Sequence, residues 1–269
     1  MNKIIGKPMD RVDGRLKVTG AATYSAEFTI KHLAYGVTVQ STIAKGRIRR
    51  IDSSAARQLE GVIAVITHEN ALTLHPISGN NPGVGKLGEK DLLPLQSDII
   101  YYDGQHIAIV VAESFQVAEQ AAALLKIAYD EEKPVVEIEE GIADAYKPRQ
   151  GLVGQGVQHQ RGDIQQGLAM AAAKIEHTYS TPVYHHNPME PHATIAEWKG
   201  DQLTVYDATQ AVLGSRGAIA KQLGIAPEKV RLVSLFLGGG FGCKGFVWPH
   251  SVMAPMAAKM VGRPVKIVI

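Results

Sequence analysis

The sequence lacks the features that mark exported, membrane-spanning or disulfide-stabilised proteins. Cys243 is the single cysteine among 269 residues, so no internal disulfide can form, which fits a reducing compartment. No apolar run approaches the roughly 18–20 residues that cross a bilayer. Residues 1–8 lack the apolar stretch of a signal peptide. We therefore expect neither a membrane span nor an export signal in this chain.

Acidic residues are absent from the last part of the chain. The overall net charge of +2 is close to neutral and argues against a general nucleic-acid binder. After Glu228, however, every charged residue is basic: Lys229, Arg231, Lys244, Lys259, Arg263 and Lys266. This stretch suits an anionic ligand, and a solvated basic surface is the alternative explanation.

What is present is the composition of a folded protein, with 45% hydrophobic and 20% charged residues and a length that favours two domains. The hydrophobic patterning of the first half predicts mixed α and β structure. Strands are expected over residues 33–41, 62–66, 106–112 and 126–129, and helices between Asp52 and Gly61 and over residues 114–125. Residues 74–98, with four glycines and three prolines, are expected to form a long loop.

The second half is predicted to begin after a boundary near residues 139–163. Helices are expected over residues 163–172, 212–223 and 249–261, and strands over 174–181, 193–199, 202–207, 229–235 and 265–269. The last of these strands is apolar and has no polar tail behind it. Either it is central and well covered or the polypeptide is the front piece of something longer, and we favour the second explanation.

The strongest local motif is the run Gly-Gly-Gly-Phe-Gly-Cys-Lys-Gly at residues 238–245, called the glycine loop below. It follows an expected strand and precedes an expected helix. Five glycines in eight residues let backbone N–H groups approach an anion closely, and a helix start adds partial positive charge. We interpret the loop as a cradle for a phosphate or oxyanion. A tight strand-to-helix turn is the alternative.

Two familiar phosphate-binding motifs do not fit this loop. Residues 240–245 match G-x-G-x-x-G, but a dinucleotide fold also places an acidic residue about 20 positions later, and none follows Glu228. The P-loop pattern needs Ser or Thr after its lysine, whereas Gly245 follows Lys244.

A second cluster combines three histidines with a glutamate: His185, His186, Glu190 and His192 lie within eight residues. These residue types raise a zinc or iron site, and hence a metal hydrolase, as one hypothesis. Their spacing matches no helical zinc motif, and two intervening prolines prevent a helix from aligning the ligands. We favour a rigid polar loop at a strand end, in which the carboxylate makes a structural hydrogen bond.

Gln210 and Cys243 each have two interpretations. Gln210 follows an expected strand as part of a Thr209-Gln210 pair. It could donate an amide hydrogen bond into a site, although taken alone it is more typical of an ordinary surface residue. Cys243 is better explained as a small buried residue than as a nucleophile, because no histidine has the local context of its base.

The order of these segments resembles the molybdopterin-binding large subunit of the xanthine dehydrogenase/aldehyde oxidoreductase family. Residues 13–24 are similar to the family's opening R-x-D-x-x-x-K-V-T-G-x-A-x-Y run, and residues 104–113 and 118–129 to its α/β-hammerhead domain. Met189-Glu190-Pro191, Thr209-Gln210 and the glycine loop then follow in the family's order.

The resemblance implies an α+β fold in three segments: an α/β-hammerhead domain over residues 10–138, a linker over 139–162 and the first part of a molybdopterin cofactor-binding domain over 163–269. It also implies which residues bind the cofactor, namely Gln210, Gly239, Gly240, Phe241, Gly242, Cys243 and Lys244. Gln210 would donate a hydrogen bond to an oxo ligand of molybdenum, and Phe241 would sit over the metal. The cofactor would be molybdopterin in its cytosine dinucleotide form, with [2Fe-2S] clusters and FAD on partner subunits.

Two departures from the family pattern shape the prediction. Xanthine-type members carry a glutamate directly after the loop lysine, and Gly245 stands there in this chain, which favours aldehydes over purines. The catalytic glutamate of the family's Gly-Val-Gly-Glu motif is missing, since the sequence contains no such motif, and no other residue can stand in for this base. No catalytic residue is therefore expected among these 269 residues, which resemble roughly the first third of the large subunit.

The sequence thus predicts the N-terminal part of a molybdenum hydroxylase that oxidises aldehydes or N-heterocycles with oxygen from water and is inactive as this fragment alone. The expected partners are an iron–sulfur subunit, an FAD subunit, the remainder of the large subunit and the small-molecule substrate, with no nucleic acid and no membrane. The expected location is cytoplasmic, or periplasmic through export with a partner subunit. A non-catalytic pterin- or nucleotide-binding module is the alternative function.

Overall fold

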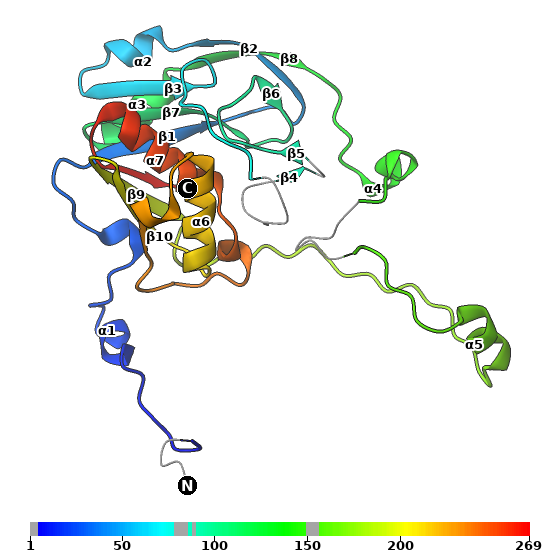
Figure 1. Ribbon diagram of the computed structural model, residues 1–269. Coiled ribbons are helices and arrows are strands. Elements are labelled where there is room, and N and C mark those ends of the chain that lie inside the picture. The colour runs from blue at the N-terminus through cyan, green and yellow to red at the C-terminus, as the bar shows by residue number, and fades with distance from the viewer. Residues whose placement is uncertain (1–4, 78–85, 88–89, 149–155) are drawn as a thin grey trace.

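A computed structural model describes residues 5–77, 86–87, 90–148 and 156–269 of the protein. A seven-stranded sheet forms its centre, and Figure 1 shows how the other elements are arranged around it. The strand order is β11-β10-β9-β12-β1-β7-β3. The bounds of these strands are β1 (Ala34–Gln40), β3 (Val62–Thr67), β7 (His106–Ala112), β9 (Ala193–Lys199), β10 (Gln202–Asp207), β11 (Val230–Val233) and β12 (Val265–Val268). The sheet therefore combines strands from both halves of the chain.

The two halves meet where β12 pairs in parallel with β1, with Ala34 opposite Val265 and Gly36 opposite Ile267. On its other side β12 pairs antiparallel with β9. A Cβ at Gly36 would lie 2.8 Å from Cγ1 of Ile267, so glycine permits this close packing. The last predicted strand is thus central and covered, and one sheet crosses the boundary expected between the two domains.

Helices cover both faces of the sheet. Ile109 and Val111 of β7 join the main core, which includes the buried residues of α7 (Pro249–Val261) and part of α6 (Val212–Gln222). Val110 points to the opposite face, where a second core is formed with α2 (Ser54–Gln58) and α3 (Phe115–Ala123). Because side chains alternate along a strand, β7 is buried at every position. This confirms the expectation that residues 106–112 are not a one-faced edge strand.

A smaller sheet packs beside the first, in the order β6 (Ile99–Ile100), β2 (Gly46–Asp52) and β8 (Lys126–Glu131). Its core contains Ile43, Ile48, Ile100 and Ile107. The sequence did not predict β2, because its outer positions are arginines and the pairing register shifts between Ile48 and Arg50. Within the predicted long loop, β4 (Lys86–Leu87) and β5 (Lys90–Asp91) form a hairpin, and residues 78–85 and 88–89 lie outside the described part.

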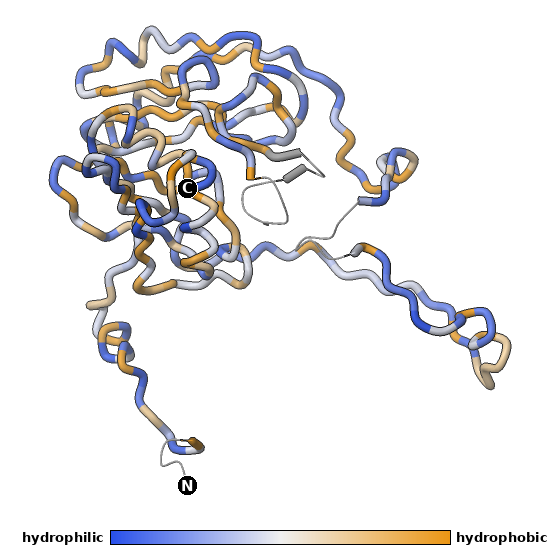
Figure 2. The backbone as a smooth tube through the Cα atoms, in the orientation of Figure 1, coloured by the Kyte–Doolittle hydropathy of each residue, from blue (hydrophilic) through white to orange (hydrophobic). Residues whose placement is uncertain are grey.

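An arm leaves the body after β8 and returns before β9 (Figure 1). It contains α4 (Ile138–Gly141), the 3-10 turn η2 (Ile142–Asp144) and α5 (Ile164–Met170), while residues 149–155 of the predicted linker lie outside the described residues. Apolar residues are scattered along it in Figure 2. The strand predicted over residues 174–181 is wrong: no described strand pairs with this segment, and Ile175 and Tyr179 are 91% and 86% exposed.

The remaining short elements are α1 (Gly14–Val18), η1 (Ser25–Glu27), η3 (Pro227–Lys229) and η4 (Cys243–Gly245). The other predicted helices and strands are present, with ends displaced by a few residues. None of the helices in the described ranges is long and apolar enough to cross a membrane.

Acid should destabilise the fold through His106. This side chain is buried in β7, its Nδ1 has no hydrogen-bond partner among the described residues, and burial lowers its pKa to about 4. Above pH 6.5 the His106 imidazole is neutral in both the folded and the unfolded chain, so it does not oppose folding. As the pH falls towards 4 the unfolded chain binds a proton that the folded chain does not, and this part of the stability is lost. Between pH 7 and pH 4.5, wild type should lose about 2–3 kcal/mol more unfolding free energy than His106→Gln in urea titrations. Exposed His159→Gln is the control, and equal losses in wild type and His106→Gln would contradict the prediction.

Candidate functional site

Strand pairing brings three distant segments to one edge of the large sheet. β9 runs antiparallel to β10, with Thr194 opposite Asp207, and β10 runs parallel to β11. The residues just before β9 and just after β10 and β11 must therefore lie side by side. These are Glu190, the Thr209-Gln210 pair and the segment that leads into the glycine loop.

The glycine loop adopts a backbone conformation that few residues tolerate. Gly239 and Gly242 have φ angles of +102° and +100°, in the region that glycine adopts freely. Phe241 has a φ of +51°, which is rare for a residue with a large side chain, and the residue is 71% exposed. The 3-10 turn η4 follows, and α7 begins only at Pro249, so the predicted helix does not start directly at the loop. A strained loop with an exposed aromatic residue is typical of a functional site.

Three consecutive amides of the loop are left without acceptors. The N–H of Gly238 donates to Oε2 of Glu190 at 2.8 Å, and that of Gly242 to Oε1 of Gln210 at 3.1 Å. No described residue accepts a hydrogen bond from the N–H groups of Gly239, Gly240 or Phe241. Backbone N–H groups are obligatory donors, so this turn can accept an anion.

Gln210 lies beside these amides with its side-chain nitrogen available. Its backbone N–H donates to the carbonyl of Lys244 at 2.8 Å, and its Oε1 accepts from Gly242. Thr209 supports the same carbonyl through its hydroxyl at 3.2 Å. Because Oε1 accepts from Gly242, Nε2 of this exposed residue is the group that can donate to a ligand.

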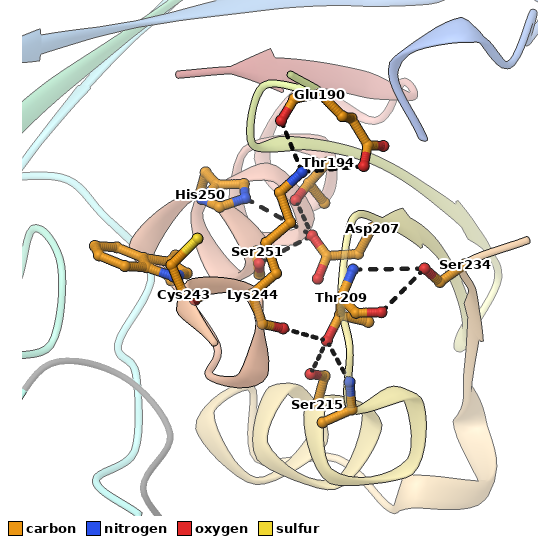
Figure 3. A network of polar contacts seen from close by, with 12 residues as sticks. Glu190, Thr194, Asp207, Thr209, Ser215, Ser234, Cys243, Lys244, His250 and Ser251 are labelled. Carbon is orange, nitrogen blue, oxygen red and sulfur yellow. Dashed lines mark hydrogen bonds and ion pairs between the residues drawn. The ribbon is translucent and has the colours of Figure 1, made fainter. Parts of the chain in front are cut away.

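Lys244 and Glu190 form a buried ion pair under the loop (Figure 3). Nζ of Lys244 donates to the carbonyl oxygen of Glu190 at 2.7 Å and to its Oε2 at 3.0 Å, and Lys244 is only 1% exposed. The Lys244 ammonium therefore points into the protein, so any contact of this residue with a ligand would involve its backbone. The expected structural hydrogen bond of Glu190 is present, but sequence reasoning did not identify Lys244 as its partner.

Cys243 is buried, as expected of a small structural residue. Its thiol donates to the carbonyl of Gly240 at 2.9 Å, and its own carbonyl accepts from the indole of Trp248 at 2.5 Å. These contacts hold the second half of the glycine loop against the start of α7.

Two further titratable groups lie beneath the loop and were missed from the sequence: Asp207 and His250. Asp207 accepts hydrogen bonds from the hydroxyls of Thr194 and Ser251, and burial raises its pKa to about 6. Nε2 of His250 lies 3.8 Å from Oδ1 of Asp207, and burial keeps the pKa of His250 well below its usual value. Burial under the loop thus favours the neutral forms of both groups; the only signal in the sequence was the position of Asp207 at a strand end.

The metal-hydrolase hypothesis is wrong. The part of the chain that the structure describes contains no group of three His, Cys, Asp or Glu side chains that could hold a metal ion. His185 and His186 are exposed on the arm, whereas Glu190 is buried and engaged by Lys244. Proximity in sequence did not translate into a shared coordination centre.

Two family models match the chain and together span most of it. The aldehyde oxidase and xanthine dehydrogenase a/b hammerhead domain matches residues 19–133, and the molybdopterin cofactor-binding domain matches residues 147–269. The chain belongs to the aldehyde oxidase and xanthine dehydrogenase family. The hammerhead and cofactor-binding expectations for the fold are confirmed.

Family members from several bacteria are similar over nearly the whole chain. The molybdenum-binding subunit of aldehyde oxidoreductase from Escherichia coli K12 is 38% identical over 99% of this chain. A probable xanthine dehydrogenase subunit from Bacillus subtilis is 32% identical over 98% of it. In each case the chain spans 35% of the relative's length.

Solved structures agree with this family fold. Aldehyde oxidoreductase from Desulfovibrio gigas has a TM-score of 0.78 at 25% identity, over 98% of this chain and 30% of that one. Quinoline 2-oxidoreductase from Pseudomonas putida has a TM-score of 0.80 at 24% identity, over 98% of this chain and 34% of that one.

A methyl group at Gly240 should disturb the site more than the fold. A Cβ at Gly240 would lie 2.5 Å from Oε1 of Gln210, so the Gln210 side chain must move and release the Gly242 amide. Gly240→Ala should therefore lower the unfolding free energy by only about 1 kcal/mol, the value of one hydrogen bond, and also lower the molybdenum content. Gly245→Ala is the matched control, because a Cβ at Gly245 would meet no atom within 4 Å. The prediction fails if both variants retain wild-type molybdenum.

Proposed function

We propose that this chain supplies the hammerhead and part of the cofactor-binding region of a molybdenum hydroxylase large subunit, and that the glycine loop binds its molybdopterin cofactor. The observation that carries the proposal is the row of three amides at Gly239, Gly240 and Phe241, which have no acceptor among the described residues, beside Nε2 of Gln210, which donates to none of them. These groups are all hydrogen-bond donors, which suits an anionic, oxygen-rich ligand.

The residues present fit this group in shape as well as in charge. A Cβ at Gly239 would crowd Phe241 and a Cβ at Gly240 would clash with Gln210, so glycine at both positions allows the loop to pack in this conformation. Gln210 would donate from Nε2 to an oxygen of the bound group, Phe241 would cover it with its exposed ring, and Gly242 would keep Gln210 oriented. When bound, the molybdenum cofactor supplies the oxidation of a substrate carbon with oxygen from water. We propose the cytosine dinucleotide form of molybdopterin. Lys229, Lys244 and Arg263 are engaged in ion pairs, so Arg231, Lys259 and Lys266 are the basic residues after Glu228 that could neutralise its added phosphate.

The proposed substrates are aldehydes or N-heterocycles, with aldehydes favoured. Gly245 provides no carboxylate directly after Lys244, so a purine would lack a hydrogen-bonding partner at this position. The similar subunit from Escherichia coli K12 is named an aldehyde oxidoreductase subunit, which agrees with this preference.

The chain is proposed to need partners for turnover. Its sequence contains no Gly-Val-Gly-Glu motif, so the general base would come from the remainder of the large subunit. Electrons would leave through [2Fe-2S] clusters and FAD on partner subunits. The relatives named as subunits, such as those from Escherichia coli and Bacillus subtilis, support a multi-subunit assembly.

Protein isolated from its native host should contain molybdenum and cytidine monophosphate. Mild acid hydrolysis should release about one CMP per molybdenum, because the dinucleotide linkage joins one nucleotide to each pterin. Elemental analysis and nucleotide chromatography on the same sample measure both quantities. Molybdenum without CMP would overturn the cytosine dinucleotide form, and absence of molybdenum from a pure sample would overturn the proposed function.

Aldehyde oxidation should be absent from the purified chain and present in the complex with its partner subunits. The assay follows reduction of an artificial electron acceptor with a panel of aldehydes and N-heterocycles. Turnover by the chain alone at the rate of the complex would contradict the need for an external base. Tight pterin binding without turnover, even in the presence of all co-purifying subunits, would instead identify a non-catalytic binding module.

A further inference from the structure

One residue holds both ends of the glycine loop. The backbone N–H of Glu190 donates to the carbonyl of Gly238 at 3.1 Å, and its Oε2 accepts from the N–H of Gly238 at 2.8 Å. The same Oε2 and the carbonyl of Glu190 accept from Nζ of Lys244. Gly238 begins the loop and Lys244 lies near its end, so four hydrogen bonds to Glu190 fix the separation of the two.

The segment between these two ends carries the three amides that the proposed function assigns to the ligand. Gly239, Gly240 and Phe241 make no hydrogen bond through their N–H groups to any described residue. The fit at Gly238 is close, because a Cβ there would lie 2.5 Å from Cβ of Glu190. The loop end is thus seated directly on Glu190, and the amides that follow start from a fixed position.

We propose that the buried Glu190–Lys244 ion pair is the positioning device of the glycine loop, which holds the three free amides in their binding arrangement before any ligand arrives. The identity of the ligand rests on the proposed function, whereas the positioning of the loop depends only on contacts within this chain. Glu190 and Lys244 are positioning residues, because their side chains bond to each other and to the loop backbone.

An ion pair is suited to this task for a physical reason. Burying two charges has a large desolvation cost, and an apolar pair of similar size is often equally stable. An apolar pair, however, has no direction, whereas the carboxylate of Glu190 must meet both the Lys244 ammonium and the Gly238 amide. The pair therefore specifies where the loop ends lie more than it stabilises the fold.

The ion pair also determines which groups of the loop can contact a ligand. The Lys244 charge is balanced by Glu190, and both side chains are almost completely buried, at 0% and 6% exposure. The anion is then recognised by the dipoles of the loop amides, which depend on the loop geometry. Without the pair, the donors would remain in the chain but the loop ends would no longer be held at a fixed separation.

The only thiol of the protein reports on this geometry. Cys243 is 7% exposed, and its thiol donates to the carbonyl of Gly240 within the loop. A thiol reagent such as Ellman's reagent can react only when the loop opens. If opening is local, the labelling rate is nearly independent of urea below the unfolding transition, whereas labelling through global unfolding rises with urea as steeply as unfolding itself.

Glu190→Gln is the main test, because it removes the charge and retains an amide oxygen that can accept from Gly238. We expect its Cys243 labelling rate to rise about tenfold, the factor that corresponds to about 1.4 kcal/mol, with weak dependence on urea. Gly238→Ala should produce the same change by steric means, since it pushes the loop away from Glu190 without altering any charge.

Two controls separate the buried pair from general effects. Glu113→Gln breaks the more exposed pair with Arg263, and Gly245→Ala adds a methyl group to the same loop without a clash. Both should label within about twofold of wild type, as expected for changes away from buried contacts. Lys244→Met combined with Glu190→Gln removes both charges together, and should fold while labelling as fast as the single variant.

The proposal is overturned if Glu190→Gln and Gly238→Ala label at the wild-type rate, or if their labelling rises only with urea in step with global unfolding. The second result would assign the pair a purely structural role. The measurement uses the chain without cofactor, so it succeeds or fails independently of molybdenum content. If the variants show the expected labelling while protein isolated from the native host lacks molybdenum, the proposed function is overturned and the positioning role remains.

Discussion

The antiparallel pairing of β9 with β10 is the constraint on which the site depends. It places the segment before β9 at the same edge of the sheet as the segment after β10, and the parallel pairing of β11 adds the path into the glycine loop. Glu190 and Gln210 then flank the loop from two sides. A shift of one residue in this register would turn the side chains of the shifted strand to the opposite face of the sheet and displace the segment attached to it, so the site and the core depend on the same strand pairing.

The parallel pairing of β1 with β12 extends this constraint across the whole chain. It buries Val265 and Ile267 between strands from the two halves, and α7 packs beneath the same strands. The residues that follow the glycine loop are therefore anchored in the shared core. A strained loop can persist where the surrounding structure holds it, and here β11 before the loop and α7 after it belong to one shared core.

Features encoded locally could be predicted from the sequence, and features encoded by tertiary contact could not. The glycine loop and the strand ends near Gln210 are local patterns, and the structure brings these segments together. The partner of Glu190 is Lys244, 54 residues away, and no local pattern links the two. The segment around Ile175 shows the opposite error: its alternation is that of a strand, but a strand forms only where a neighbour can accept its hydrogen bonds, and none is present among the described residues.

The charged groups around the loop explain why its binding groups can be backbone amides of glycine and not charged side chains. Its ammonium, on Lys244, is balanced by Glu190, and beneath it burial favours the neutral form of His250 and raises the pKa of Asp207 to about 6. A free buried charge would attract an anion more strongly, but it would also have a desolvation cost in the unliganded protein that several kcal/mol of other interactions would have to offset. Amide dipoles avoid this cost and act over a short range, so their strength depends on orientation. A site of this design requires a rigid backbone, and the contacts of Glu190, Gln210 and Cys243 with the loop provide one.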